Sequence, residues 1–271
     1  MPAETSLQDG DLQGALTLLQ QQIRQNPADA KLRVFLFQLR AIMGQWERAL
    51  NQLDVAGELD AGVLAMVQTY REALQCEVLR AEVFAGKRSA MIFGQPDGWL
   101  ALLMEGQRLT AECAYEQAKT IFDQTLDAAP PISGQIDGVP FDWIMDGDTR
   151  LGPVLEAVVN GRYYWIPLHR IRSIDIEKPE DLRDLVWMPA HFTWANGGEM
   201  VGLIPTRYPG SESATDPLLS LARKTEWLEP VPGLYLGQGQ RMLLTEGGEF
   251  PLMDVRRIEF ATSDRTESAS G

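Results

Sequence analysis

Residues 142 to 157, DWIMDGDTRLGPVLEA, hold a group of side chains that could do chemistry. Asp146, Asp148 and Glu156 lie close together in the sequence around Arg150. Two carboxyl groups held near a scissile bond can act as the acid and the base of a hydrolase. The same residues can instead build a turn, because Asp side chains bond nearby backbone N–H groups and a glycine between them can take positive φ. Since an arginine close by can neutralise one of the aspartates, the pattern favours structure over catalysis.

The spacing of possible ligands argues against a metal site. A calcium loop that starts at Asp146 needs glycine at its sixth position and glutamate at its twelfth, but Leu151 and Ala157 stand there. A zinc site needs paired Cys and His ligands. The two histidines, His169 and His191, have no second His or Cys nearby. We therefore predict no metal.

Motifs for nucleotides and nucleophiles are missing as well. The glycine-rich stretch GLYLGQGQR lacks the third glycine of a dinucleotide fingerprint, and Met242 stands in that place. There is no Walker A pattern and no G-x-S-x-G elbow. The sequence predicts a protein with neither a cofactor nor a catalytic site.

Charge and cysteine content narrow the class of protein. The 271 residues include 38 acidic and 24 basic ones, for a formal net charge of −14. Nucleic acids and anionic membranes are bound by clustered Lys and Arg, so neither partner is expected. Cys76 and Cys113 are too few for a disulfide framework, and both are expected to be buried free thiols in helices. Without a signal peptide or a membrane-spanning apolar run, the protein is expected in the cytoplasm.

Two halves with different patterns must position these side chains. The first half contains three copies of one helical pattern, at 10 to 28, 44 to 62 and 114 to 130. The first two copies are offset by 34 residues, the tetratricopeptide period. In each copy a bulky residue, a small one three later and a large one four beyond that share one helix face. The aligned residues are Leu12, Ala15 and Leu19; Trp46, Ala49 and Leu53; and Tyr115, Ala118 and Phe122.

The remaining helices of the first half are expected at 29 to 43, 62 to 86 and 97 to 112, with 62 to 86 as one extended helix. After residue 129, proline and glycine become frequent, and short apolar or alternating runs typical of strands replace the helical pattern. We therefore predict an α+β protein. A tetratricopeptide-like α-superhelical half should pack against a mainly antiparallel β domain.

The expected domains are residues 1–131 (helical), 132–260 (β-rich α+β) and 261–271 (a disordered tail). Stacked helical repeats present a groove that binds peptides or helices. With only about three units, that groove can equally be filled by the second half of the chain. The sequence leaves both alternatives open.

A series of motifs runs through the second half. In order, they are FDWIMDGDTRLGPVLE, GRYYWIPL, DLRDLVWMPA, IPTRYPGS, KTEW and GQGQRMLL. In this combination the chain resembles, over nearly its whole length, the ImpE/TagJ family of SciE-type virulence proteins, which are accessory components of bacterial type VI secretion systems. The most specific residues are Asp146, Asp148, Arg150, Gly152 and Pro153.

The resemblance implies a non-enzymatic adaptor. It implies recognition of an N-terminal helix of the small subunit of the contractile sheath, and through it a link to the AAA+ unfoldase that disassembles contracted sheath. Aromatic residues are favoured as binding anchors. We expect them among Tyr163, Tyr164 and Trp165, or at Trp99 and Tyr115 beside the junction of the two halves.

Two alternatives to the sheath adaptor remain. The helical half could serve as a tetratricopeptide-like scaffold for another cytoplasmic protein. Alternatively, the chain could be a hydrolase that uses Asp146, Asp148 and Glu156.

Overall fold

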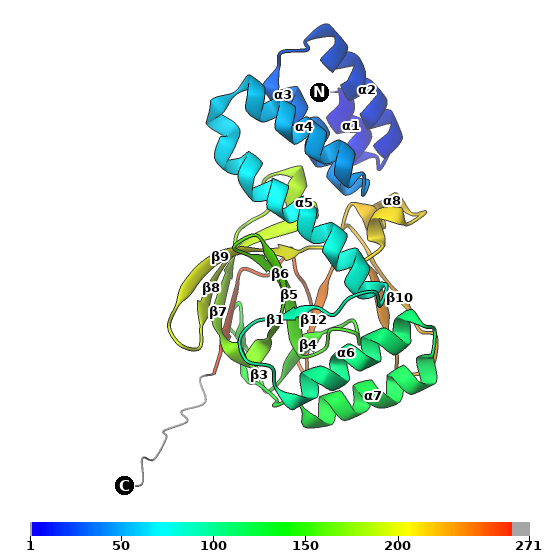
Figure 1. The fold of residues 1–271 in the computed structure, drawn as a ribbon, viewed down its shortest axis with the longest axis vertical. Coiled ribbons are helices and arrows are strands. Elements are labelled where there is room, and N and C mark those ends of the chain that lie inside the picture. The colour runs from blue at the N-terminus through cyan, green and yellow to red at the C-terminus, as the bar shows by residue number, and fades with distance from the viewer. Residues whose placement is uncertain (1, 262–271) are drawn as a thin grey trace.

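The computed structural model describes residues 2–261, in which the first helices form a stack at one end, a long helix leads away from that stack, and the last two helices of the first half lie beside a region of twisted sheets (Figure 1). The helices are α1 (Pro2–Gln8), α2 (Leu12–Gln25), α3 (Ala30–Ile42), α4 (Trp46–Leu59), α5 (Leu64–Phe84), α6 (Gly98–Ala111), α7 (Tyr115–Ala128) and α8 (Pro217–Ser220). Three of them, α3, α5 and α6, correspond to the predicted partner helices, and α5 is the extended one. The short helix α1 has no counterpart in the prediction. Apart from Ala261, the predicted tail lies outside the described residues.

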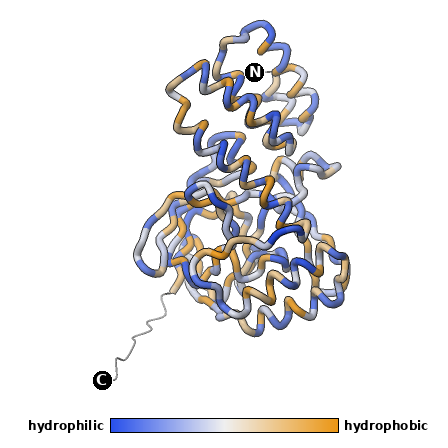
Figure 2. The backbone as a smooth tube through the Cα atoms, in the orientation of Figure 1, coloured by the Kyte–Doolittle hydropathy of each residue, from blue (hydrophilic) through white to orange (hydrophobic). Residues whose placement is uncertain are grey.

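The packing of the helices confirms the repeat spacing. Almost no solvent reaches the small residues Ala15, Ala49 and Ala118 or the larger Leu19, Leu53 and Phe122. A small residue at the contact allows two helices to approach closely. The approach of α6 to α7 also depends on Gly106, since a Cβ there would lie 2.6 Å from the ring of Phe122. Hydrophilic and hydrophobic residues alternate along each helix in Figure 2, as expected for helices with one buried face.

The second half is built from antiparallel sheets. Its strands are β2 (Gly134–Ile136), β3 (Val139–Phe141), β4 (Ile144–Asp146), β5 (Val154–Val159), β6 (Arg162–Pro167), β7 (Ile171–Ile176), β8 (Trp187–Trp194), β9 (Glu199–Pro205), β10 (Thr225–Leu228), β11 (Leu236–Gly239), β12 (Met242–Thr245), β13 (Gly248–Pro251) and β14 (Arg257–Phe260). With β1 (Met91–Ile92), the largest sheet has the order β1-β6-β5-β9-β8-β7-β14-β2-β3. Two smaller sheets pair β13-β12-β4 and β10-β11. The α+β prediction is confirmed.

The first half is not helical throughout. Residues Met91 and Ile92 form strand β1, which pairs in parallel with Tyr164 and Trp165 of β6. Every other pair of neighbouring strands in the nine-stranded sheet is antiparallel. The helical half therefore contributes an edge strand to the sheet of the second half.

One face of the helical stack is covered by the second half of the chain. The ring of Trp187 in β8 lies 6.2 Å from that of Trp46 in α4 and 5.7 Å from that of Tyr70 in α5. The guanidinium of Arg183 lies 4.9 Å from the Tyr70 ring. Arg207 Nη1 donates to the last carbonyl of α3 at 2.8 Å. The second half of the chain therefore covers the face of the stack to which Trp46 and Tyr70 belong.

Two local predictions are wrong. Cys76 is buried as predicted, but Cys113 is exposed in the turn between α6 and α7. Cys113 directly follows the C-cap of α6, a position that often has a left-handed backbone, and its φ is 60°. Gly44 takes the corresponding position after α3, with a φ of 66°. Gly147 does not take positive φ. Its missing side chain instead makes room for Trp227, whose ring would lie 2.6 Å from a Cβ at this position.

A further structural finding concerns membranes. Among residues 2–261, every helix is too short or too polar to cross a bilayer.

Candidate functional site

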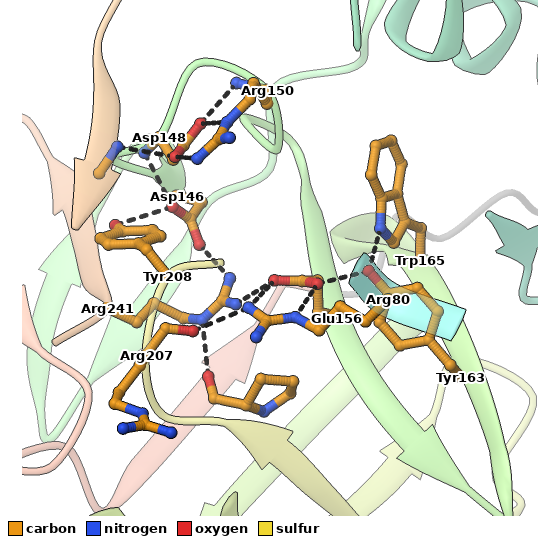
Figure 3. A network of polar contacts seen from close by, with 12 residues as sticks. Arg80, Asp146, Asp148, Arg150, Glu156, Tyr163, Trp165, Arg207, Tyr208 and Arg241 are labelled. Carbon is orange, nitrogen blue, oxygen red and sulfur yellow. Dashed lines mark hydrogen bonds and ion pairs between the residues drawn. The ribbon is translucent and has the colours of Figure 1, made fainter. Parts of the chain in front are cut away.

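The three carboxyl groups singled out in the sequence lie where α5 meets the sheets (Figure 3). Asp146 ends β4, Glu156 lies in β5, and Asp148 lies in the loop between these strands. All three side chains are almost completely buried. Because every residue of β5 is buried, Glu156 carries a charge into an apolar layer and requires partners there.

Asp148 and Arg150 close the turn between β4 and β5. Asp148 Oδ1 accepts from Arg150 N and Nε, and Oδ2 accepts from Arg150 Nη2, at 2.9, 2.8 and 2.5 Å. Oδ2 also accepts from a backbone N–H of β11 at 2.8 Å. Paired contacts of this kind are the strong form of an Arg–carboxylate interaction. Gly152 has a φ of 49° and accepts the N–H of the last β4 residue, while Pro153 leads into β5.

Arg241 and Arg80 hold the other two carboxyl groups. Arg241, between β11 and β12, donates Nη1 to Asp146 Oδ2 at 2.5 Å and Nη2 to Glu156 Oε2. Arg80 of α5 donates Nε and Nη2 to the two Glu156 oxygens at 2.7 and 2.9 Å. The Tyr208 hydroxyl donates to Asp146 Oδ1 at 3.0 Å. A continuous chain of ion pairs therefore runs from β4 through β5 to α5.

Aromatic side chains complete this network. The Tyr163 hydroxyl donates to Glu156 and accepts from the indole N–H of Trp165 at 2.7 Å. On α5, Glu77 accepts from the indole N–H of Trp187 at 2.9 Å. Each of these buried polar groups therefore has a partner, as buried Tyr and Trp require.

Burial and ion pairing shift the pKa values of the two acids in opposite directions. Burial raises the pKa of Asp146 to about 6, and the charge of Arg241 offsets this only in part. Burial also disfavours the charged form of Glu156, but Arg80 and Arg241 outweigh it and lower the pKa to about 2. Burial, and then the charge of Glu156, raises the pKa of Tyr163 well above its ordinary value. At neutral pH both carboxyl groups are ionised and the phenol keeps its proton.

The network has the properties of a structural joint. Asp146, Asp148 and Glu156 each face a guanidinium group and are closed off from solvent. General acid–base catalysis requires the acid or base to reach its substrate, so the hydrolase alternative gains no support from this geometry. Among residues 2–261, no group of three or more His, Cys, Asp or Glu is placed to hold a metal ion.

Two charged residues of the network belong to no motif that sequence reasoning selected. They are Glu77 and Arg80. Glu77 and Arg80 follow the buried Ala73 at helical spacing on α5, so a charge on an apolar helix face is the signal that marks them. Arg241 stands in the motif GQGQRMLL, but the motif does not show that this arginine pairs with Asp146, which is 95 residues away in the sequence.

The aromatic residues proposed as partner anchors differ in exposure. Tyr163 and Trp165 are almost fully enclosed, and their polar groups bond within the network, so in this conformation they offer no surface to a partner. Tyr164 and Tyr115 are half-buried. Trp99 is buried as well, but it lines a groove at the junction of the two halves.

That groove, which we call the joint groove, consists of two adjoining cavities of about 360 and about 630 Å³. The first is also lined by Leu126 and Asp127 of α7 and by Trp143, which precedes β4. The lining residues that both cavities share are Trp99, Pro130, Pro131, Ile132 and His169.

Known proteins share both the sequence and the fold of this chain. Residues 138–259 match the family described as ImpE protein, and residues 6–72 match a tetratricopeptide repeat family. A crystal structure of a Vibrio parahaemolyticus protein has the same fold, with a TM-score of 0.86, 25% identity, and coverage of 97% of this chain and 98% of that chain. The type VI secretion system accessory component TagJ of Pseudomonas aeruginosa is 52% identical over 264 residues, which are 97% of this chain and 92% of that protein. By this identity and coverage, the chain belongs to the ImpE/TagJ family.

Proposed function

We propose that this protein is a non-enzymatic accessory component of a bacterial type VI secretion system. The observation that carries the proposal is the 52% identity to TagJ, which covers 97% of the chain. An alignment of this extent includes the helical stack and the β region together, so more than a single repeat module is shared. The buried ion-pair network supports a non-enzymatic role, because it keeps Asp146, Asp148 and Glu156 away from any substrate.

The finer proposal is that the protein is an adaptor. It binds the N-terminal helix of the small subunit of the contractile sheath, and thereby links the sheath to its AAA+ unfoldase in the cytoplasm. Helical-repeat proteins commonly bind peptides and helices. A strongly acidic chain, with a net charge of −14, suits a partner segment that carries Lys or Arg.

Calorimetry tests the first interaction. A peptide with the N-terminal segment of the cognate small sheath subunit, titrated into the full chain, should bind saturably with one peptide per protein. A scrambled peptide of the same composition should release no binding heat. Failure of the cognate peptide to bind would overturn the adaptor proposal.

Affinity purification tests the link to the unfoldase. The unfoldase should co-purify with the tagged protein from cells that contain the small sheath subunit, and should be lost from cells that lack it. Recovery of the same unfoldase without the sheath subunit would contradict a bridging role. A scaffold for an unrelated protein predicts a different complex, one that persists after the sheath subunit is deleted.

A further inference from the structure

A cavity apart from the joint groove lies where α5 ends and the chain passes on to β1; we call it the linker cavity. Its volume is about 390 Å³, which is within the range of cavities that bind small molecules. Residues 86–90, between α5 and β1, line it together with Ala101, Met104 and Glu105 of α6. The linker cavity shares no lining residue with the joint groove.

The linker cavity is positively charged on a strongly acidic protein. Its lining residues include the bases Lys87, Arg88 and Arg108 and a single acid, Glu105, whereas the whole chain has a net charge of −14. Lys87 is exposed and has no ion-pair partner among residues 2–261. A local excess of positive charge of this kind attracts anions.

Several hydrogen-bond donors of the linker have no acceptor within the described chain. Arg88 binds Glu82 through Nε at 2.6 Å, but its two Nη groups have no acceptor among residues 2–261. The same is true of the backbone N–H groups of residues 88–90. Two cationic side chains beside a run of N–H groups suit a doubly charged oxyanion such as phosphate better than a single carboxylate.

A buried amide adds an unpaired acceptor. Gln107 of α6 lines the cavity and is only 3% exposed. Its Nε2 donates to the carbonyl oxygens of Val83 at 3.3 Å and Phe84 at 2.8 Å, so a flipped amide would turn its oxygen towards these two acceptors. Its Oε1 is left without a donor among residues 2–261. Because a buried acceptor without a donor is unfavourable, this atom points to a ligand that carries an N–H or O–H group. The terminal torsion of glutamine is broad, so a modest turn of the amide can present Oε1 to such a group.

We propose that the linker cavity binds a small phosphate-bearing molecule. Lys87 and the Nη groups of Arg88 hold the phosphate oxygens, and Gln107 Oε1 accepts a hydrogen bond from an O–H or N–H group of the same molecule. Arg108 is engaged by Glu105 and by Glu112 on the surface, and such exposed pairs are weak enough to exchange for a ligand. The inference goes beyond the proposed function and does not depend on it.

Calorimetry of the full chain with inorganic phosphate and with sulfate, at about pH 7.5, tests both parts of the site. The two ions are similar in size and charge, but hydrogen phosphate carries an O–H group and sulfate has none. Phosphate should therefore bind saturably, and sulfate should bind at least about tenfold more weakly, because it cannot donate to Gln107. Equal affinities for the two ions would overturn the proposal.

The variant Lys87→Gln removes the free positive charge of the rim and should raise the Kd for phosphate at least about fivefold. The matched control is Lys178→Gln. Lys178 is also exposed and has no ion-pair partner in the described chain, but it does not line the linker cavity, so the Kd should stay unchanged. Both positions are exposed, so both variants should melt close to the parent chain. An equal loss of affinity in the two variants would indicate an adventitious ion only and would overturn the site.

Parallel titrations with glucose 6-phosphate and with AMP identify the source of the phosphate. A lower Kd for either ester than for inorganic phosphate assigns the site to an organic phosphate, and the opposite order assigns it to the free ion. If none of the three binds saturably, the linker cavity is not a phosphate site, while the proposed accessory function stands.

Discussion

Glu156 owes its ionised state to two guanidinium groups that act against burial. Its folded pKa of about 2 is below the ordinary 4.5, so its contribution to stability is fully present above pH 4.5 and is lost as pH falls towards 2. Glu156→Gln removes the carboxylate that Arg80 and Arg241 share, so that Arg80 keeps only Glu77 and Arg241 only Asp146, and should lower the free energy of unfolding at pH 7 by ~3–5 kcal/mol. The deficit relative to the parent chain should shrink below pH 4.5, as measured by urea unfolding at a series of pH values.

The control for this prediction is Glu105→Gln. Glu105 pairs with Arg108 on the exposed surface of α6, and its loss should change stability little at any pH. A Glu156→Gln variant whose deficit stayed constant down to pH 2 would contradict the pairing of Glu156 with Arg80 and Arg241.

The variant Asp148→Asn tests whether Asp148, in the turn before β5, has a structural or a catalytic role. The substitution removes the charge that pairs with Arg150 and should cost ~1–3 kcal/mol, which lowers the melting temperature by several degrees. Asp54→Asn, which breaks the exposed pair with Arg71, should cost only ~0–1 kcal/mol. Unchanged melting of Asp148→Asn together with loss of a measurable turnover would favour the hydrolase alternative instead.

The turns after the helices differ in the residue that takes the left-handed conformation. After α1 and α3, the left-handed residue is Gly10 or Gly44, but after α6 it is Cys113 with a φ of 60°. A left-handed non-glycine residue costs ~1–2 kcal/mol, so Cys113→Gly should raise the free energy of unfolding by about 1 kcal/mol, measured by urea unfolding under reducing conditions. Cys113→Ala, which removes the thiol without freeing the backbone, should not be stabilising.

The reverse substitution is the matched control. Gly10→Ala places a Cβ at ordinary contact distance, 3.6 Å from Pro217, so its expected loss of stability reports the backbone conformation alone. Equal stability of Cys113→Gly and Cys113→Ala would show that the turn is not strained.

The helices could be predicted from the sequence, whereas the roles of several strand residues could not. Ala49 and Leu53 are four apart on one helix, so their shared face follows from local geometry. Strand β6 is packed on both faces, and such strands lose the alternation of polar and apolar residues. The local sequence therefore does not predict that Tyr163 and Trp165 are enclosed while Tyr164 is half-exposed. Their burial depends on Glu156 and on helix α5, both fixed by long-range contacts.

One of the hydrophobic clusters spans both halves of the chain, while the buried residues of two others lie within a single half each. A single cluster of buried residues contains Phe37 and Phe122 from the helices together with Trp165, Trp187 and Leu234 from the β region. The ion pair between Arg80 of α5 and Glu156 of β5 also links the two halves. Neither half alone buries the apolar residues of the shared cluster, so the full chain should unfold as one cooperative unit.

Separating the chain between residues 131 and 132 tests this dependence. Without the second half, the 1–131 fragment exposes the apolar side of α5 and leaves Glu77 and Arg80 without Trp187 and Glu156. We expect it to aggregate, or to melt non-cooperatively with reduced helical circular dichroism. Coexpression of the two fragments should restore a stable complex, because the shared core can then form. A 1–131 fragment that is monomeric and melts cooperatively by itself would show instead that the helical half is an independent domain and that the ion-pair network only docks it.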